Sequence, residues 1–448
     1  MTRTKSSLVQ TLQSAARPLV GGADDFDPLL ALIGESRFVL LGEASHGTHE
    51  FYRIRGEITK RLVREKGFNA IAVEADWPDA YSVNRYVQGR SADADAGDAL
   101  ASFQRFPQWM WRNADVLDFV GWLREYNDAL GAAGAKVGFY GLDLYSLHTS
   151  MAAVVDYLKI VDPDAAERAA RRYACFDHFG EDPQTYGYAT TIGMTPSCET
   201  EVLRQLVELR RATAEYARRD GRLAPDDFFF AERNAQLVAS AEQYYRTMFL
   251  GRVESWNVRD RHMAETLEAL SRFLEGQGRS GKLVVWAHNS HLGDARATEM
   301  GARGELNLGQ LVRERFPGQA VLVGFTTYAG TVSAASDWGA PVERKQVRPA
   351  LPQSYEAVFH QCDRGNFFLN LRSEAEAAEL LRVPRLERAI GVIYQPATER
   401  ASHYFGSCLP QQFDAVLHYD HTRAVEPIER TSRWEAGEEL PATYPSAL

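Results

Sequence analysis

A short turn near the start of the chain carries side chains suited to acid–base chemistry. Glu43 and His46 lie three residues apart in the segment 42–47, Gly-Glu-Ala-Ser-His-Gly, which follows an apolar run. An imidazole with an ordinary pKa of ~6.5 can remove a proton from water at neutral pH, provided that a carboxylate holds its tautomer. The turn therefore predicts a general base at His46, with Glu43 or Glu74 as the carboxylate that orients it.

Acidic residues and histidines also follow three other apolar runs. Ligands of an open parallel sheet bind beyond the carboxyl ends of its strands, so the residues after each run are the candidates. They are Glu74 and Asp76 after residues 70–73, Asp143 shortly after residues 137–140, and His288 and His291 after residues 283–286. Taken singly, each is equally well explained as a helix cap or a satisfied buried side chain. Together, four strand ends that deliver such groups to one edge predict a shared active site.

Three further positions have a structural and a functional interpretation. Arg55 lies in the helix after His46, where a surface salt bridge is the default. Arg259 and Asp260 either orient the site or pair with each other, and we favour the structural role. Trp77 belongs to a set of aromatic residues that line a substrate cleft or belong to the core. His291 shares a face with His288 only if that turn is helical, and we expect substrate contacts from Asp143, His291 and Trp77.

The patterns of several well-known active sites are missing from the sequence. It has no Gly-x-Ser-x-Gly elbow, no phosphate-binding Gly-x-x-x-x-Gly-Lys-Ser/Thr loop and no His-Glu-x-x-His motif. Ser45 precedes His46, but neighbours on a tight turn usually point apart, which disfavours a serine nucleophile.

Short apolar runs bounded by turn residues predict the strands that position these groups. They are residues 37–41, 70–73, 137–140, 283–286, 321–325, 367–369, 390–394 and 415–417. Between the first two runs, apolar residues at helical spacing end at Gly67, which predicts a strand–helix–strand unit with parallel strands. The predicted fold class is α/β, with a mostly parallel central sheet flanked by helices.

A long helical segment interrupts the strand pattern. Between residues 147 and 277 the strand signals vanish, and charged stretches with helical periodicity replace them. We therefore expect residues 1–146 and 278–448 to form the two parts of an α/β core, and residues 147–277 to form a helical insertion that caps the sheet.

Composition excludes several classes of partner. The formal net charge is −10 and the pI is about 5.7, which argues against a nucleic-acid partner bound through clustered basic residues. No window approaches the ~20 apolar residues of a membrane helix, and no apolar run of signal-peptide length follows the basic start. The four cysteines are far apart in the sequence, so we expect reduced thiols and a cytoplasmic location.

The motifs above resemble those of the erythromycin esterase family. The similarity lies in residues 41–48, 71–74 and 286–291, and it extends in the same order from about residue 25 to residue 420. The resemblance implies a hydrolase that opens an ester or a cyclic ester with water activated by an imidazole, without a covalent serine intermediate. It implies His46 as the general base and places Glu43, Glu74, Arg55 and His288 among the catalytic residues. Family members differ in metal dependence, and the resemblance leaves the natural substrate open.

Two alternatives remain open at this stage. The same histidines and carboxylates suit a divalent metal such as Zn²⁺ or Mn²⁺, although none has the compact spacing of a strong metal motif, and we favour a site that requires no cofactor. A non-catalytic protein that sequesters a small molecule is the other alternative. In the hydrolase, Arg55 or a protonated His288 would stabilise the oxyanion that develops on the attacked carbonyl.

Overall fold

A mostly parallel β-sheet flanked by helices forms the centre of the protein, as predicted. The computed structural model describes residues 2–131, 134–180, 182–219 and 225–437. The main sheet follows the order β1-β8-β11-β6-β2-β5-β3-β4, and β7 pairs with β6. Its strands are β1 (Arg17–Pro18), β2 (Phe38–Leu41), β3 (Ala70–Asp76), β4 (Gly138–Asp143), β5 (Leu283–Trp286), β6 (Ala320–Ala334), β7 (Glu343–Val347), β8 (Phe367–Asn370) and β11 (Ala415–Thr422).

The strands from β11 to β4 run parallel, and the strands outside this group run antiparallel to their neighbours. β2 pairs in parallel with both β5 and β6, and β3 pairs in parallel with both β5 and β4. β8 is antiparallel to β11, β1 to β8 and β7 to β6. A separate two-stranded antiparallel sheet consists of β9 (Arg385–Arg388) and β10 (Tyr404–Ser407).

Side chains of the central strands alternate between two hydrophobic cores. In β2, Phe38 and Leu40 belong to one core and Val39 and Leu41 to the other, and all four are fully buried. Such burial on both faces is what a parallel sheet covered by helices requires. Glu43, Glu74, Asp143 and His288 lie instead at or just beyond the ends of strands, where the backbone leaves the sheet.

The predicted strand–helix–strand unit is formed by β2, α3 (His49–Lys66) and β3. The helix ends at Gly67, which adopts a left-handed conformation with φ 68° and donates its backbone N–H to Leu62. The later strand β5 lies between β2 and β3 in the sheet. The other helices of the N-terminal part are α1 (Thr2–Ala15), α2 (Asp27–Ile33), α4 (Trp77–Val87), α5 (Ala96–Leu100) and α6 (Ala114–Ala129).

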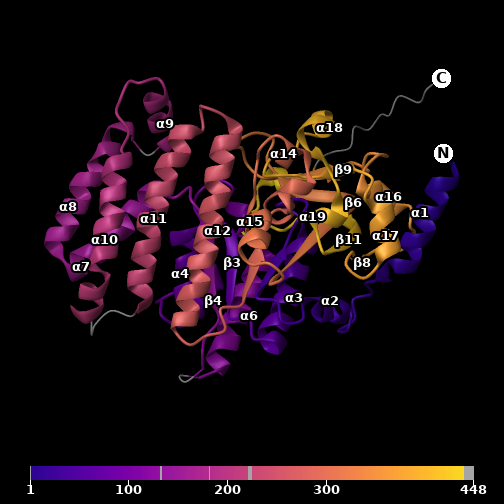
Figure 1. Cartoon of the computed structure of the whole chain (residues 1–448), viewed down its shortest axis with the longest axis horizontal. Helices are drawn as coiled ribbons and strands as arrows, with labels where there is room; N and C mark the ends of the chain where they lie inside the picture. Colours follow the sequence, from indigo (N-terminus) through magenta and orange to yellow (C-terminus); the bar gives the residue numbers. More distant parts are fainter. Residues whose placement is uncertain (1, 132–133, 181, 220–224, 438–448) are drawn as a thin grey trace.

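The described residues between β4 and β5 contain helices and loops but no strand. They are α7 (Leu147–Val161), α8 (Pro163–Tyr173), α9 (Pro183–Thr191), α10 (Glu199–Arg219), α11 (Pro225–Thr247) and α12 (Arg252–Gly276), with a 3₁₀ segment over Ala174–Phe179. Figure 1 shows that α7, α8, α10 and α11 stand together at one end of the molecule and that α12 lies between them and the C-terminal half. The bundle packs beside β4, the edge strand of the main sheet, through α4 and α12.

The C-terminal half surrounds the remaining strands with short helices. They are α13 (Asn289–Leu292), α14 (Glu299–Ala302), α15 (Leu308–Arg315), α16 (Tyr355–His360), α17 (Ala375–Leu381), α18 (Glu399–Ser402), α19 (Leu409–Gln412) and α20 (Ser432–Ala436). The strand predicted over residues 390–394 is wrong. Ile390 and Val392–Tyr394 make isolated bridges and backbone hydrogen bonds to Ala44, Ser45, His46 and Ala335, so this apolar run is a buried connection beside the site.

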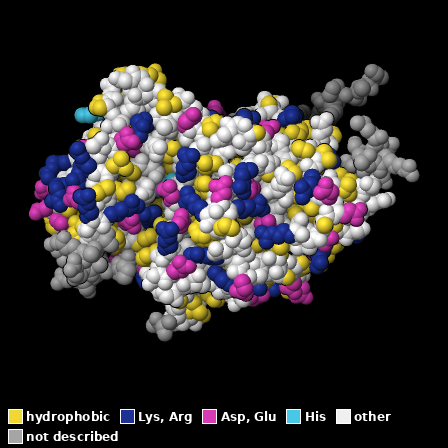
Figure 2. All heavy atoms as spheres, viewed as in Figure 1, with side chains coloured by type: hydrophobic (Ala, Val, Ile, Leu, Met, Phe, Trp, Pro, Cys, Tyr) yellow, Lys and Arg dark blue, Asp and Glu magenta, His cyan; other side chains and the backbone are white. Residues whose placement is uncertain are grey.

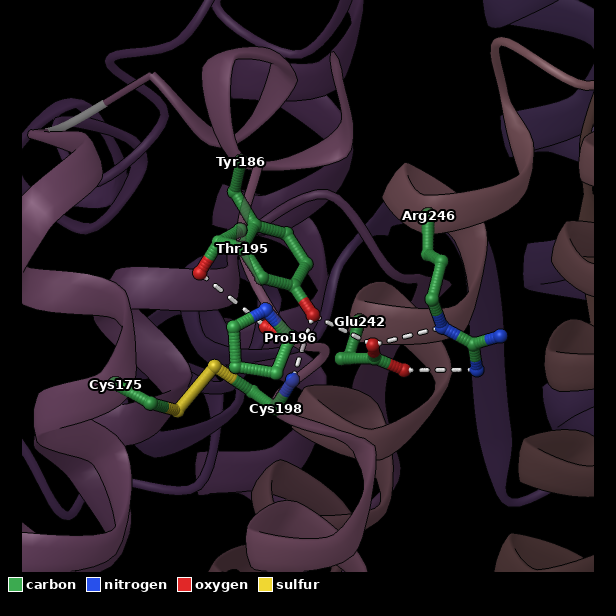
Figure 3. Close-up of a disulfide and its surroundings, with 7 residues drawn as sticks. All are labelled: Cys175, Tyr186, Thr195, Pro196, Cys198, Glu242 and Arg246. Atoms are coloured by element: carbon green, nitrogen blue, oxygen red, sulfur yellow. Dashed lines mark hydrogen bonds and ion pairs between the residues drawn. A yellow bond between two sulfur atoms is a disulfide. The ribbon is translucent and has the colours of Figure 1, made fainter. Parts of the chain in front are cut away.

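The expectation of four reduced thiols is wrong for two cysteines. Cys175 and Cys198 form a disulfide with their Cα atoms 6.1 Å apart, as Figure 3 shows. Beside it, the Tyr186 hydroxyl donates to Glu242 and accepts the backbone N–H of Cys198. Cys175 lies in the 3₁₀ segment after α8 and Cys198 lies just before α10. The chain folds back over the 23 residues between them, which leaves no signal in cysteine spacing. Cys362 and Cys408 are buried and free.

Apolar helices and surface charge are the features that a membrane or a strongly charged partner would require. Among the described residues, no helix is long and apolar enough to cross a bilayer. On the face shown in Figure 2, basic and acidic side chains are intermixed rather than gathered into separate patches.

Candidate active site

Glu43, His46 and Arg55 form a buried chain of contacts at the end of β2. His46 Nδ1 lies 2.8 Å from Glu43 Oε1, and Arg55 Nη2 lies 2.6 Å from Glu43 Oε2. Arg55 comes from α3 and is fully buried between the rings of Tyr52 and Trp286. The Tyr52 hydroxyl donates to the backbone carbonyl of His46, which fixes the turn. The arrangement identifies Glu43 as the carboxylate that holds His46 and leaves Nε2 of that imidazole available.

His288 lies opposite His46 at the end of β5. The two ring centroids are 5.0 Å apart. His288 Nδ1 accepts the backbone N–H of Ser290, so in the neutral ring the proton resides on Nε2. Nε2 is buried and makes no well-aligned hydrogen bond among the described residues, although the backbone of Ala44 lies close to the ring. Burial and the nearby His46 lower the pKa of His288 to about 3, which is contrary to the protonated His288 considered from the sequence.

Glu74, Asp143 and Arg259 join the ends of β3 and β4 to helix α12. Arg259 binds Asp143 through Nε and Nη2 at 3.0 and 2.7 Å and reaches Glu74 Oε1 at 2.7 Å. The other oxygen of Glu74 accepts the backbone N–H of His288 at 2.9 Å. Burial raises the pKa of Glu74, but His291 and Arg259 outweigh it and hold that pKa well below its usual range. Glu74 is thus an ionised support for the β5 turn.

His291 and Asp260 form a second buried pair beside this network. His291 Nδ1 lies 2.9 Å from Asp260 Oδ1, which also accepts the backbone N–H of Leu308. His291 Nε2 lies 3.0 Å from Arg259 Nη1 and 3.4 Å from Glu74 Oε1. Burial lowers the pKa of His291, but Asp260 and Glu74 outweigh burial and raise it to about 9. Asp260 and Arg259 therefore do not pair with each other, and both contact the site.

Two adjoining pockets share His46, Glu74 and Arg259 and form the two halves of one cleft. One half, which we call the aromatic half, has a volume of about 210 Å³ and includes Phe103, Phe106, Trp111, Tyr145 and Trp338 among its lining residues. The other, the polar half, has a volume of about 560 Å³ and includes Trp256, His288, Ser290, His291 and His403. Among the described residues of the 147–277 segment, those that line the cleft all belong to α12.

Not every predicted residue reaches the cleft. Trp77 is buried in the core, where it stacks on Tyr140 at 5.8 Å, and it lines neither half. Ser45 is also buried and forms a short hydrogen bond to Thr48, away from both halves. Arg55 contacts Glu43 rather than the cleft, so the oxyanion role considered for it has no support in its position.

One cleft residue, Arg105, was not predicted from the sequence. Arg105 lies in the loop after α5 and binds Asp76 at 3.0 Å, and Asp76 also accepts the backbone N–H of Tyr145. The Tyr145 ring lies between the guanidinium groups of Arg105 and Arg259, at 4.6 and 5.0 Å. A loop arginine has no periodicity or motif around it, so only the fold reveals its place.

The carboxylates of Glu43, Glu74 and Asp143 lie against cationic or donor groups rather than around a common centre. Within the described residues, no group of three or more His, Cys, Asp and Glu side chains is arranged to hold one. Glu43 is bound to Arg55 and His46, and Glu74 and Asp143 to Arg259, so the carboxylates already contact cationic groups or hydrogen-bond donors. The remaining open nitrogens belong to His46 and His288, which are two ligands where a catalytic zinc usually has three.

The sequence matches the family model described as erythromycin esterase over residues 63–422. Erythromycin esterase type II of Escherichia coli is 23% identical over 394 residues, with 84% of this chain and 90% of that protein covered. A putative hydrolase of Bacillus subtilis is 22% identical, with 86% of this chain and 83% of that protein covered.

Solved structures share the fold over nearly the whole chain. A Bacillus cereus protein superposes with a TM-score of 0.76 at 21% identity and covers 95% of this chain and 99% of its own. A mutant of an erythromycin esterase in its open conformation superposes with a TM-score of 0.67 at 18% identity, covering 91% of this chain and 96% of its own.

The fold and the site define an α/β enzyme with acid–base groups at its strand ends, and the family match gives the class of bond. The chain belongs to the erythromycin esterase family. It is a hydrolase that acts on ester bonds.

Proposed function

We propose that the protein hydrolyses a carboxylic ester or lactone by direct attack of a water molecule that His46 activates. The observation that carries this proposal is the buried contact chain from Arg55 through Glu43 to His46 Nδ1. Because Nδ1 faces a carboxylate, Nε2 is the nitrogen available to water, and His46 lines both halves of the cleft. A substrate that spans the two halves would therefore present its ester carbonyl to this base.

The steps follow from the positions of the two imidazoles. His46 Nε2 takes a proton from water while the oxygen attacks the carbonyl carbon, and the C–O bond to the leaving alcohol then breaks. Neutral His288 can donate its Nε2–H to the carbonyl oxygen as negative charge develops there. The imidazolium of His46 returns the proton to the leaving oxygen. A carboxylic acid and an alcohol result, and no serine or metal takes part.

Glu74 and Arg259 hold the residues around the two imidazoles in place. Glu74 holds the backbone of His288, and Arg259 holds Glu74 and Asp143 in place. Removing either charge would leave a buried partner without its counter-ion, so these residues position the site rather than react.

The test uses esters of increasing size and matched variants. Wild type, His46→Ala, His288→Ala and Ser45→Ala would be assayed against p-nitrophenyl butyrate, a six-membered lactone and erythromycin, the substrate named by the Escherichia coli relative. We expect His46→Ala to lose about 10²–10⁴ in kcat, as removal of a general base does, while Ser45→Ala stays near wild type. A folded His46→Ala protein with undiminished hydrolysis would refute the mechanism. Binding of all three compounds without turnover would instead favour a sequestering protein.

A further inference from the structure

Asp79 is a carboxylate of the cleft that has no ion-pair or hydrogen-bond partner among the described residues. It lies in the first turn of α4 and lines the aromatic half. Among the described residues, no hydrogen bond or ion pair reaches its carboxylate oxygens. The neighbouring acids differ, because Asp76 is bound by Arg105 and by the backbone of Tyr145. Asp79 is thus free to meet a ligand.

The charges of the aromatic half favour a cationic ligand. Four carboxylates line it, from Glu74, Asp76, Asp79 and Asp143, against the two guanidinium groups of Arg105 and Arg259. A cleft lined by an excess of one sign concentrates ligands of the opposite sign. This excess of negative charge would repel an anionic ligand, and both guanidinium groups already bind carboxylates.

The walls of the same half narrow the chemistry of that cation. Phe103, Phe106, Trp111 and Trp338 line it together with Asp79. The rings of Phe106 and Trp338 meet edge to face at 5.0 Å, although they come from distant loops. Aromatic faces attract alkylated ammonium groups, which bury their methyl or methylene groups while the ring meets the positive charge. A strongly hydrated inorganic ion would lose hydrating water against such walls, and the single free carboxylate of Asp79 would not replace it.

We propose that the aromatic half is a binding site for an ammonium group carried on an apolar body, with Asp79 as its counter-ion. The consequence for catalysis rests on the proposed function: the preferred ester would carry a protonated or quaternary amine on the part that enters this half. Cation binding itself does not depend on turnover.

The environment of Asp79 gives the binding a pH signature. Burial and the neighbouring Asp76 raise the pKa of Asp79 to about 7, and Arg105 acts in the opposite direction. A cation stabilises the ionised form, so at pH 6.5 its binding expels the proton that Asp79 holds. A quaternary ammonium has no proton of its own, and any proton released therefore comes from the protein.

The experiment titrates the full chain with benzyltrimethylammonium, and with benzyl alcohol as the neutral comparison. Isothermal calorimetry at pH 6.5 in two buffers of different ionisation enthalpy gives both Kd and the proton count. We expect wild type to prefer the cation and to release about half a proton or more per cation bound. Asp79→Asn should weaken cation binding about tenfold, abolish the release and leave benzyl alcohol unaffected.

Two further variants keep the outcome interpretable. Trp338 is 60% exposed, so Trp338→Leu does not threaten folding and should weaken the cation about three- to fivefold. Asp118→Asn, at an exposed position of α6 that lines neither half, should bind as wild type does. Equal affinity of wild type and Asp79→Asn for the cation, or equal affinity of wild type for the cation and benzyl alcohol, would overturn the proposal. The cation titration requires no turnover, so failure of the esterase mechanism and failure of this site are separate results.

Discussion

Replacing Asp260 by Asn tests the electrostatic account of the site through stability rather than turnover. The carboxylate of Asp260 is fully buried and faces His291 Nδ1 with both oxygens, at 2.9 and 3.0 Å. Asn keeps the shape and can still accept the Nδ1–H, but it removes the negative charge. The pKa of His291 should then fall from about 9 to below its ordinary value of ~6.5, because burial and Arg259 oppose the protonated ring.

The magnitude follows from the width of this shift. A group whose pKa is raised in the folded protein adds stability that is complete below the unfolded pKa and is lost as pH rises through the folded pKa. For His291 the window runs from ~6.5 to about 9, and at about 1.4 kcal/mol per unit the contribution is about 3 kcal/mol. The difference in unfolding free energy between wild type and Asp260→Asn should therefore be about 3 kcal/mol larger at pH 6.5 than at pH 9.5.

Urea unfolding at four values of pH between 6.5 and 9.5 measures this difference, with Asp118→Asn as the exposed control. NMR titration of labelled histidine rings gives the pKa directly, and the His291→Gln spectrum assigns the signal. A His291 that titrates below pH 6.5 in wild type would refute the reasoning. In that case the 3.0 Å contact with Arg259 Nη1 would be a hydrogen bond that a neutral imidazole accepts.

Four other perturbations follow from the geometry. Arg55→Met should cost about 3–5 kcal/mol of unfolding free energy, because it leaves Glu43 charged and buried without its partner; a cost under ~1 kcal/mol in urea unfolding would contradict this. Gly47→Ala should yield little folded protein, since its Cβ would collide with the backbone of Ser333. Gly67→Ala has open space and should lose only about 1–2 kcal/mol for its left-handed backbone. Dialysis against EDTA should leave ester hydrolysis unchanged, and loss of activity restored by Zn²⁺ or Mn²⁺ would return the metal alternative.

The strand ends were the part of the site that could be read from the sequence. Each predicted acid or histidine at residues 43, 46, 74, 143, 288 and 291 lies at the end of a strand that the structure contains or shortly after it, and the parallel arrangement brings them to one edge of the sheet. Apolar runs in parallel sheets are strongly patterned, which is why their ends were predictable. The proposed roles of these residues still await the assays above.

The errors have a common physical origin in tertiary contacts. The run at 390–394 is as apolar as a strand, but its neighbours are the turn at Ala44 and the end of β6 rather than a strand edge. Trp77 follows β3 directly, yet it turns into the core to meet Tyr140. Arg55 was recognised only by family resemblance, because its burial against Glu43 depends on how α3 packs on the sheet.

The position of β5 between β2 and β3 has a consequence for biosynthesis. The strand neighbours of β2 are β5 and β6, so its four buried residues have no sheet partner until residue 283 has left the ribosome. At ~5–20 residues per second, that interval lasts on the order of tens of seconds. The nascent N-terminal part must therefore be shielded from aggregation while the helical bundle is being made. A gene fragment ending before β5 would yield an incomplete sheet, and His46 takes its final place only when the second half of the chain arrives.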